Sequence, residues 1–386
     1  MFHKLLVLLS AYTNNRRNIC WLVLAATSIY IILFIFIETW IQLCVRNSTN
    51  NNDTKKEQHF NICHAQKSAK RLINIAWYKN LHWLPNSFDF NQCEFKNCGL
   101  TSGLENMTNN DAIIFHYRLL GSEVPPKPEG QIWILWNTES PVNDKPLSKK
   151  WSKMFDWSAT YRSDSEIVNQ RLTKLTEKPS NKNYSNIFSK KRKFAAWVVS
   201  NCETQSNRHL YVKELQRYVQ VDVFGKCGSN KTFCEKKSMA ECHLSFSDDY
   251  KFYLGFENSI CRDYITEKLF HGFLDNNNVI YVYRGAPNVD NLVPKNTFVN
   301  TKHYDSPKML GGYLKQLGTN KTEYISILKE KDKYILLENK VKRTFCSMCK
   351  LLNTYKNTNI SWTGRNFNSW FRNGVCNSPT DLSFPT

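Results

Sequence analysis

The stretch YKFYLGFENSICRDYITEKLFHGFL, residues 250–274, places a cation where an anion could bind. Lys268 falls in the first turn of an expected helix, where unpaired amides and the helix dipole already make the potential positive. The start of a helix that follows a strand is a ready-made phosphate site, so this pattern predicts phosphate binding. The alternative is a solvated Lys268 beside a Glu267 that only complements the dipole, and the pattern leaves both readings open.

The elements around Lys268 follow from the hydrophobic pattern. Residues 250–256 are rich in aromatic side chains and predict a buried strand, and residues 258–264 predict a polar loop. The next residues divide into an apolar and a polar helical arc: Ile265, Leu269, Phe270, Phe273 and Leu274 against Glu267, Lys268 and His271. We therefore expect a strand, a loop and a helix in this order, with Asp263 or Thr266 as the N-cap.

Two other side chains suit the same chemistry. Arg208 begins a helical pattern between two predicted strands, 194–199 and 219–224, so a second cation is expected at a helix start. Glu139 follows the predicted strand 131–136, and the carboxyl ends of strands are where α/β enzymes bind their ligands. It is a candidate general base, and the alternative is an ordinary loop or capping glutamate.

Short apolar runs separated by turn residues predict an α/β fold with buried parallel strands. They begin at Leu72, Asp111, Gln131, Phe194, Tyr250 and Val279. Ser306 and Pro307 predict the start of a later helix, as N-cap and first helical residue. A chain of 386 residues has room for two such domains.

The residues FENS at 256–259 and DYITEKLF at 263–270 resemble the donor-binding signature of the α1,3/α1,4-fucosyltransferases, which transfer fucose from GDP-fucose to a glycan. Glu139-Ser140-Pro141 is similar to the E-S-P segment of that family's acceptor domain, and YRSDSE at 161–166 resembles its Y-R-x-D-S-D. The resemblance covers about residues 70–350. Departures occur at Glu166, at Asn169-Gln170-Arg171 in place of Pro-Tyr-Gly, and at Arg284, where the strand end is usually apolar.

The resemblance implies a GT-B architecture, with two Rossmann-like domains facing a central cleft. It implies inverting transfer of fucose from GDP-β-L-fucose to N-acetylglucosamine of lactosamine or LacdiNAc glycans. Glu139 would deprotonate the acceptor hydroxyl, and Glu267 would stabilise an oxocarbenium-like sugar. The implied donor-binding residues are Arg208, Asn258, Tyr264, Lys268 and Glu257. A core α1,3-fucosyltransferase of N-glycans, an inactive glycan-binding relative and a glycoside hydrolase are the alternatives.

A base and two fixed cations supply what this chemistry needs, so no metal is required, and a divalent ion such as Mn²⁺ is expected only to stimulate GDP release. The motif Cys346-Ser-Met-Cys349 is expected to form disulfides rather than bind zinc. Of 13 cysteines, Cys20 and Cys44 lie in or near an apolar N-terminal stretch, which leaves an odd number in the body. One cysteine of the body is then free, or it pairs with Cys44. As a further alternative, Cys44 bridges two chains of a homodimer.

The N-terminal region predicts a membrane anchor. Residues 19–37 carry no charge and would span roughly 28 Å as a helix, about the hydrocarbon thickness of a bilayer. Lys4, Arg16 and Arg17 precede the span, so the positive-inside rule places the N-terminus in the cytosol and the rest in the lumen. Sequons beyond the span support a secretory lumen, at Asn47, Asn52, Asn106, Asn183, Asn230, Asn320 and Asn359. With the resemblance, a single-pass type II Golgi membrane protein is expected. This topology argues against nucleic acid as a partner despite the net charge of +19.

The expected domain plan follows the chain in order. It comprises a cytosolic tail (1–18), a transmembrane signal-anchor (19–37), a stem (38–68), an acceptor-side α/β domain (69–178), a linker (179–193), a GDP-fucose-binding α/β domain (194–345) and a disulfide-rich C-terminal segment packed back on the body (346–386). The basic run Lys190–Lys193 is expected to be a solvated face at the end of the linker.

Overall fold

The computed structural model describes residues 71–79, 82–102, 107–170, 172–177, 180–229, 232–337, 340–355 and 366–382. The predicted tail, membrane span and stem lie outside these ranges, as do five of the seven sequons. Within the ranges, no helix combines the length and the apolar character needed to cross a bilayer.

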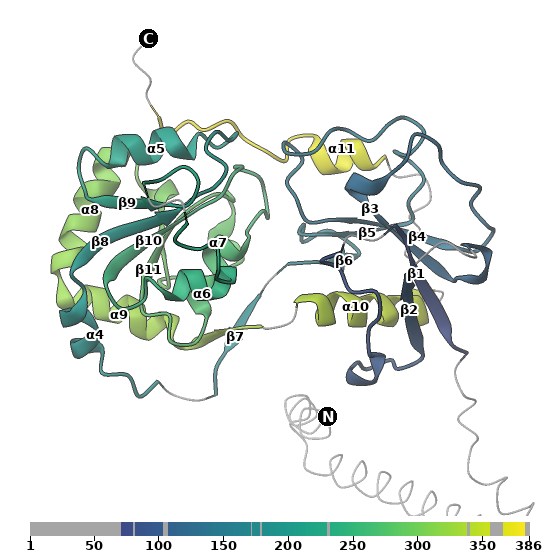
Figure 1. The fold of residues 1–386 in the computed structure, drawn as a ribbon, viewed down its shortest axis with the longest axis horizontal. Helices are drawn as coiled ribbons and strands as arrows, with labels where there is room; N and C mark the ends of the chain where they lie inside the picture. Colours follow the sequence, from purple (N-terminus) through teal and green to yellow (C-terminus); the bar gives the residue numbers. More distant parts are fainter. Residues whose placement is uncertain are drawn as a thin grey trace, which may run out of the picture. The chain divides into compact units, whose positions relative to one another are not determined.

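Among the described residues, seven strands, β1 to β7, come first along the chain, and from α4 to β11 helices and strands alternate (Figure 1). The strands are β1 (Ile73–Lys79), β2 (Cys98–Ser102), β3 (Ala112–His116), β4 (Ile132–Asn137), β5 (Trp157–Thr160), β6 (Ile167–Val168), β7 (Thr173–Leu175), β8 (Lys193–Val198), β9 (Val221–Phe224), β10 (Tyr250–Phe256), β11 (Ile280–Arg284), β12 (Val299–Asn300) and β13 (Tyr334–Leu336). The helices are α4 (Tyr184–Lys190), α5 (Arg208–Leu215), α6 (Met239–Leu244), α7 (Glu267–Phe270), α8 (Pro307–Thr319), α9 (Lys321–Lys331), α10 (Lys340–Thr354) and α11 (Phe367–Arg372).

The first sheet is parallel throughout, in the order β2-β1-β3-β4-β5-β6. Alternate residues of its strands face two separate cores, and both are apolar because helices cover both faces. Phe345 of α10 packs on the face that carries Trp77 and Trp136. Phe371 of α11 packs on the other face, with Trp133, and Figure 1 shows the two helices on opposite sides of the sheet. Two helices from the end of the chain therefore complete the first sheet.

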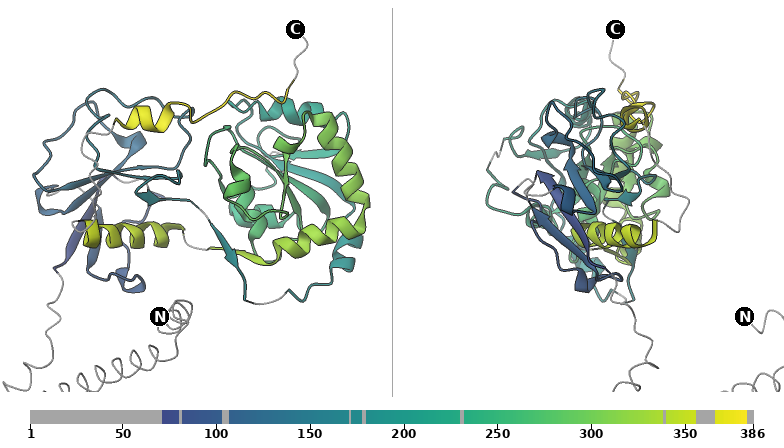
Figure 2. Two further views of the ribbon diagram at one scale, coloured as in Figure 1. Left: turned by 180° about the vertical axis from the view of Figure 1, so that it is seen from behind. Right: turned by 90° about the vertical axis from the view of Figure 1, so that its right-hand side faces the viewer.

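The second sheet is also parallel, in the order β12-β11-β10-β8-β9. Its strands again bury side chains on both faces. Helices α5, α8 and α9 pack on one face against Phe252 and Val282, and α6 and α7 pack on the other against Tyr253 and Tyr281 (Figure 2). The predicted α/β class with parallel strands is confirmed, including the strand at 250–256.

The segment predicted as a polar linker, 179–193, holds helix α4. Asn183 caps this helix by accepting a hydrogen bond from the backbone N–H of Asn186. One side of the helix packs on the core that α5, α8 and α9 form with the second sheet. Lys191, expected on a solvated face, is buried, and its ammonium group donates to the carbonyl of Ser247. Beside this segment β7 and β13 pair as an antiparallel ribbon.

All ten cysteines among the described residues form disulfides. The pairs are Cys93–Cys346, Cys98–Cys349, Cys202–Cys227, Cys234–Cys242 and Cys261–Cys376. The prediction that the CxxC motif forms disulfides is confirmed, although its two cysteines bond to the first sheet's 93–98 segment and not to each other. The eleventh cysteine of the body, Cys63, lies outside the described ranges, as do Cys20 and Cys44.

Candidate active site

Glu139 lies two residues beyond the end of β4, where the sequence places it. Its backbone N–H donates to the side-chain oxygen of Asn137 at 3.0 Å, which fixes the turn out of the strand. Carboxylate oxygen Oε1 accepts hydrogen bonds from the backbone N–H of Ser140 at 2.9 Å and from Nδ2 of Asn143 at 3.1 Å. The side chain keeps 26% exposure, so solvent or a ligand can reach it.

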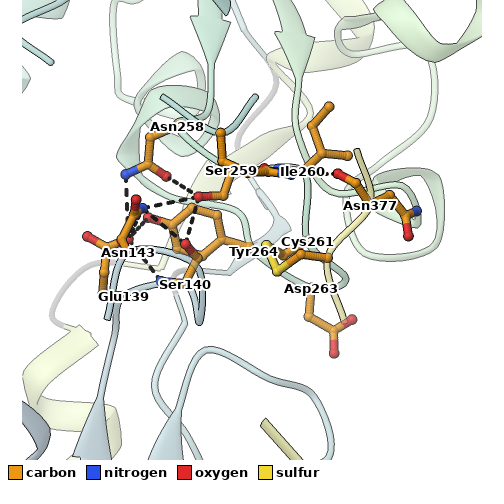
Figure 3. The surroundings of a disulfide bond; sticks show 12 residues. Glu139, Ser140, Asn143, Asn258, Ser259, Ile260, Cys261, Asp263, Tyr264 and Asn377 are labelled. Atoms are coloured by element: carbon orange, nitrogen blue, oxygen red, sulfur yellow. Dashed lines mark hydrogen bonds between the residues drawn. A yellow bond between two sulfur atoms is a disulfide. The ribbon is translucent and has the colours of Figure 1, made fainter. Parts of the chain in front are cut away.

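The loop after β10 meets Glu139 from the second sheet (Figure 3). The hydroxyl of Tyr264 donates to Glu139 Oε1 at 2.6 Å, and Nδ2 of Asn258 approaches the same oxygen at 3.5 Å. The hydroxyls of Ser140 and Ser259 lie 2.7 Å apart. The structure therefore joins the predicted base to two of the residues predicted to bind the donor.

The surroundings of Glu139 keep it ionised. Burial raises the pKa of its carboxyl group, but hydrogen bonds from Tyr264, Ser140, Asn143 and Asn258 outweigh burial and hold the pKa below its ordinary value. An ionised carboxylate at neutral pH can accept a proton, as a general base must.

Glu257, Glu267 and Lys268 form one charged cluster at the start of α7. Lys268 Nζ lies 2.9 Å from Glu267 Oε1 and 3.4 Å from Glu257 Oε2. Glu257 is fully buried at 0% exposure, and its Oε1 accepts from the backbone N–H of Thr266 at 2.7 Å. Glu257 therefore holds the loop against the helix start.

The charges of this cluster oppose one another. Burial raises the pKa of Glu257. Burial also works against ionisation of Glu267, but the adjacent Lys268 ammonium prevails and lowers the pKa of Glu267 to about 2. Burial likewise disfavours the charge on Lys268, yet the two carboxylates raise its pKa. Lys268 is thus an ammonium group already paired with carboxylates, and an anionic ligand has to compete with them.

Arg208 is the first residue of α5, as predicted, and is buried at 4% exposure. Its guanidinium donates to the carbonyl of Phe256 at 2.7 Å and to that of Asn201 at 3.1 Å. Its Nε has no hydrogen-bond partner among the described residues. Burial lowers the pKa of Arg208, and the charges of Glu257 and Glu267 act in the opposite sense. The two predicted cations therefore flank the same pair of carboxylates.

The predicted helix at 265–274 is shorter than expected. Only one α-helical turn forms, α7, followed by a 3-10 turn at His271–Phe273, in which Gly272 lies against the ring of Tyr281. Thr266 is the N-cap, which confirms one of the two predicted residues. His271 is buried at 2% exposure beside His243 rather than on a polar face. A single turn has little dipole, so any anion binding here relies mainly on side-chain charge.

Asp263, the other expected N-cap, has a different task. Its backbone is left-handed at φ +65°, and its carboxylate accepts hydrogen bonds from the backbone N–H and hydroxyl of Ser163 at 3.0 and 2.8 Å. The backbone carbonyl of Asp263 accepts from the Gln170 side chain at 2.7 Å. Tyr161 packs edge-on against Tyr264 at 5.0 Å. The 161–170 loop thus braces the loop that carries Tyr264.

The unusual residues of the 161–170 loop are therefore structural. Glu166 Oε2 accepts from both the backbone N–H and the hydroxyl of Ser158 at 2.7 Å. Asn169 is 1% exposed and its side-chain oxygen accepts from the hydroxyl of Thr344 in α10 at 3.3 Å. Arg171 lies outside the described residues.

The sequence prediction missed two charged neighbours of Glu139. Arg118 Nη2 lies 3.8 Å from Glu139 Oε2, and Arg118 Nε donates to Asp144 at 2.8 Å. Asp144 also accepts from Nδ2 of Asn137 at 3.1 Å. Asp144 follows the E-S-P segment and Arg118 follows β3, so proximity to neighbouring strand ends was the available signal. Within the described ranges, no group of three or more His, Cys, Asp or Glu side chains is arranged to hold a metal ion.

Comparison with known proteins identifies the family. Residues 188–370 match the family model for the glycosyltransferase family 10 (fucosyltransferase) C-terminal region, and residues 68–171 match the fucosyltransferase N-terminal model. The chain is 33% identical to glycoprotein 3-alpha-L-fucosyltransferase A of Drosophila melanogaster, over 82% of this chain and 64% of that protein. It therefore spans less than two thirds of that relative's length.

A second relative agrees with the first. The chain is 31% identical to 4-galactosyl-N-acetylglucosaminide 3-alpha-L-fucosyltransferase FUT5 of Hylobates lar, over 65% of this chain and 67% of that protein. A solved α1,3-fucosyltransferase structure with GDP aligns at a TM-score of 0.48 and 17% identity, over 78% of this chain and 94% of that chain. The two family models and the relatives confirm what the motifs at 139–141 and 256–270 predicted: the chain belongs to glycosyltransferase family 10, the fucosyltransferases.

Proposed function

We propose that this chain is an inverting α1,3-fucosyltransferase that transfers L-fucose from GDP-β-L-fucose to N-acetylglucosamine of a glycan. The observation that carries the proposal is the contact between Glu139, after β4, and Asn258 and Tyr264, after β10. In open α/β sheets, ligands bind beyond the carboxyl ends of the strands, and both segments lie at such ends. A GT-B arrangement would place the acceptor beside the first sheet and the donor beside the second.

The chemistry assigns each charged group a task. Glu139 takes the proton of the acceptor hydroxyl, whose oxygen attacks the anomeric carbon while the bond from that carbon to the diphosphate breaks. Glu267 stabilises positive charge on the sugar, and Arg208 and Lys268 stabilise negative charge on the leaving GDP. The unpaired Nε of Arg208 supports this assignment, because a buried donor without a partner gains free energy when a phosphate oxygen reaches it.

The names of the relatives support two acceptors. The Drosophila protein is named for glycoproteins, and the Hylobates protein is named for 4-galactosyl-N-acetylglucosaminide. We propose lactosamine or LacdiNAc antennae as the principal acceptor and the N-glycan core as the alternative.

The proposal extends to the cellular setting. We place the catalytic part in the Golgi lumen behind a signal-anchor at 19–37, because five disulfides among the described residues suit an oxidising compartment. No metal is assigned to the reaction, and Mn²⁺ is expected to stimulate turnover without being essential. Measurement of initial rates with EDTA and with added Mn²⁺ checks this expectation.

The deciding experiment incubates the purified chain with GDP-fucose and a panel of lactosamine, LacdiNAc and chitobiose-core acceptors, and reads the linkage of the product by NMR. An α1,3-fucosylated product is expected. Glu139→Gln keeps the size of the side chain but removes the base, and is expected to lower turnover by about 10²- to 10⁴-fold. Near-normal turnover by this variant would remove Glu139 from its role.

Control reactions separate the other classes of function. Release of fucose from a fucosylated glycan without GDP-fucose would indicate a glycoside hydrolase. Glycan binding without any transfer would indicate a binding protein that has kept the fold.

A further inference from the structure

The two oxygens of the Glu139 carboxylate have unequal surroundings. Oε1 accepts from Ser140 N–H at 2.9 Å, Asn143 Nδ2 at 3.1 Å and Tyr264 Oη at 2.6 Å, with Asn258 Nδ2 at 3.5 Å. Beside Oε2 the described residues place Arg118 Nη2 at 3.8 Å, which is beyond hydrogen-bond distance. The lone pairs of Oε1 are therefore occupied, whereas those of Oε2 can accept a hydrogen bond from a ligand.

The strongest of these bonds comes from outside the first sheet. Tyr264 is 3% exposed, and its ring is held by Tyr161, edge-on at 5.0 Å. The backbone carbonyl of Tyr264 accepts from the hydroxyl of Tyr283 in β11 at 3.1 Å. Contacts therefore hold both the ring and the backbone of Tyr264. A hydroxyl donor fixed in this way can set the orientation of a half-buried glutamate.

We infer that Tyr264 is a positioning residue for the general base: it anchors Oε1 of Glu139 so that Oε2 faces the acceptor and takes the proton. The inference rests on the proposed function and adds to it, because Tyr264 was expected to contact the donor. The proton passes from the acceptor hydroxyl to Oε2, and the electron pair of the former O–H bond, now on the acceptor oxygen, forms the new bond to the anomeric carbon. The electron pair of the broken carbon–oxygen bond leaves with GDP.

This arrangement links the two substrates. Tyr264 and Asn258 stand at the two ends of the loop 258–264, which was predicted to contact GDP-fucose. A loop that orients the base and also touches the donor makes base orientation dependent on the position of that loop. The Glu139 carboxylate is then oriented toward the acceptor only when the loop 258–264 of the second sheet is in place.

The test is Tyr264→Phe, which removes one hydroxyl and keeps the ring. Initial rates are measured from pH 4 to 8 with GDP-fucose and the best acceptor, to give kcat and KM for each substrate. We expect kcat to fall about tenfold and the acid limb of the kcat/KM profile to move up by about one pH unit, because Glu139 loses a hydrogen bond to its charged form. The KM for GDP-fucose is expected to stay within about twofold.

Tyr161→Phe is the matched control. It removes a buried phenol hydroxyl that has no hydrogen-bond partner among the described residues, from the ring that packs against Tyr264. Its profile is expected to coincide with that of the parent chain, and Arg118, the charged group facing Glu139, is unchanged in both variants. Thermal melting of both variants identifies any loss of folding.

The outcomes separate this inference from the proposed function. If the parent chain transfers no fucose to any acceptor, the proposed function fails. If the parent chain is active but Tyr264→Phe raises the KM for GDP-fucose and leaves the acid limb in place, Tyr264 binds the donor and the positioning role is wrong. A shifted acid limb with an unchanged donor KM supports the positioning role.

Discussion

The guanidinium of Arg284 makes two parallel hydrogen bonds to the carboxylate of Asp381, with Nε to Oδ2 at 2.7 Å and Nη2 to Oδ1 at 2.6 Å. Its Nη1 donates to the carbonyl of Ser206 at 2.6 Å, and the planar group lies over the ring of Tyr211 at 4.7 Å. Arg284 is 2% exposed at the end of β11. The charge that looked out of place in the sequence therefore ties the C-terminal segment to the second sheet.

Asp381→Asn is expected to destabilise the chain by about 3 kcal/mol, because it leaves a buried guanidinium without its counter-charge. Chemical denaturation measures the change. The double variant Arg284→Met with Asp381→Leu replaces the pair by apolar groups, and is expected to recover most of the loss. Equal stability of the single and double variants would show that the unpaired guanidinium is not the source of the loss.

Each of two disulfides, Cys93–Cys346 and Cys98–Cys349, is expected to reduce the stability that is lost when the other is removed. Each closes a loop of about 250 residues on its own, with sequence separations of 253 and 251. When one is present, the other closes only a ring of roughly ten residues, so loss of either alone should cost about 3 kcal/mol in the chain-entropy model.

Loss of both bonds should cost roughly 8 kcal/mol, which is comparable with the whole stability of an ordinary domain. Cys93→Ala with Cys346→Ala, Cys98→Ala with Cys349→Ala, and the fourfold variant form the set, measured by denaturation and by yield of folded protein. Strictly additive losses would contradict this account.

Two buried lysines should make stability depend on pH. Burial lowers the pKa of Lys191 and of Lys331 to about 7, from an ordinary value of 10.5. Between about pH 7 and 10.5 these two side chains bind more protons in the unfolded chain than in the folded chain, so their contribution to the free energy of unfolding rises with pH across this window. Below pH 7 both states are protonated, and these lysines add no slope.

Denaturation midpoints at pH 6, 7.5 and 9 check this expectation. Lys331 donates to the carbonyls of Asn277 at 2.6 Å and Val279 at 2.7 Å, and Lys331→Met removes one of the two titrating groups. The variant is expected to show a smaller rise between pH 7 and 9 than the parent chain. An identical rise would exclude Lys331 as its source.

Asn183 and Asn320 are expected to carry N-linked glycans when the chain is made in a secretory pathway. Both are exposed, and each uses its side-chain oxygen to cap a helix, α4 and α9. One N–H of the Asn320 amide donates to Oε2 of Glu323 at 3.2 Å, which leaves the other N–H for a sugar. Mass analysis before and after glycosidase treatment tests occupancy.

Matched variants separate the glycan from the cap at Asn320. Thr322→Ala removes the sequon and keeps the cap, so folding stability should change little. Asn320→Ala removes both and should cost about 1 kcal/mol more. Equal stability of these variants would show that the cap is dispensable.

The local sequence pattern predicted those elements whose own residues favour a strand or a helix. β10 was predicted because Tyr250–Phe256 is rich in aromatic side chains, and Thr266 was predicted as one of two caps because its neighbours begin a helix. β5 (Trp157–Thr160) and the two-residue β6 were missed, because they are short and become strands only by pairing with an existing sheet.

The contacts of the site could be predicted only in part. Motif order named Glu139 and Tyr264, but their hydrogen bond joins residues 125 positions apart, and no local pattern specifies such a pairing. The same holds for Arg284 and Asp381, which are 97 positions apart.

Helix α10 covers a sheet whose strands were made some two hundred residues earlier. During synthesis the first sheet is therefore translated first and completed last, since one face stays uncovered until Phe345 and its neighbours have entered the same compartment. Cys93 and Cys98 must wait for Cys346 and Cys349 during that interval. A ribosome that stops before α10 would leave a nascent chain in which three of the described cysteines, Cys93, Cys98 and Cys261, lack their partners and an apolar face is uncovered. Chaperones and thiol oxidoreductases retain species of this kind.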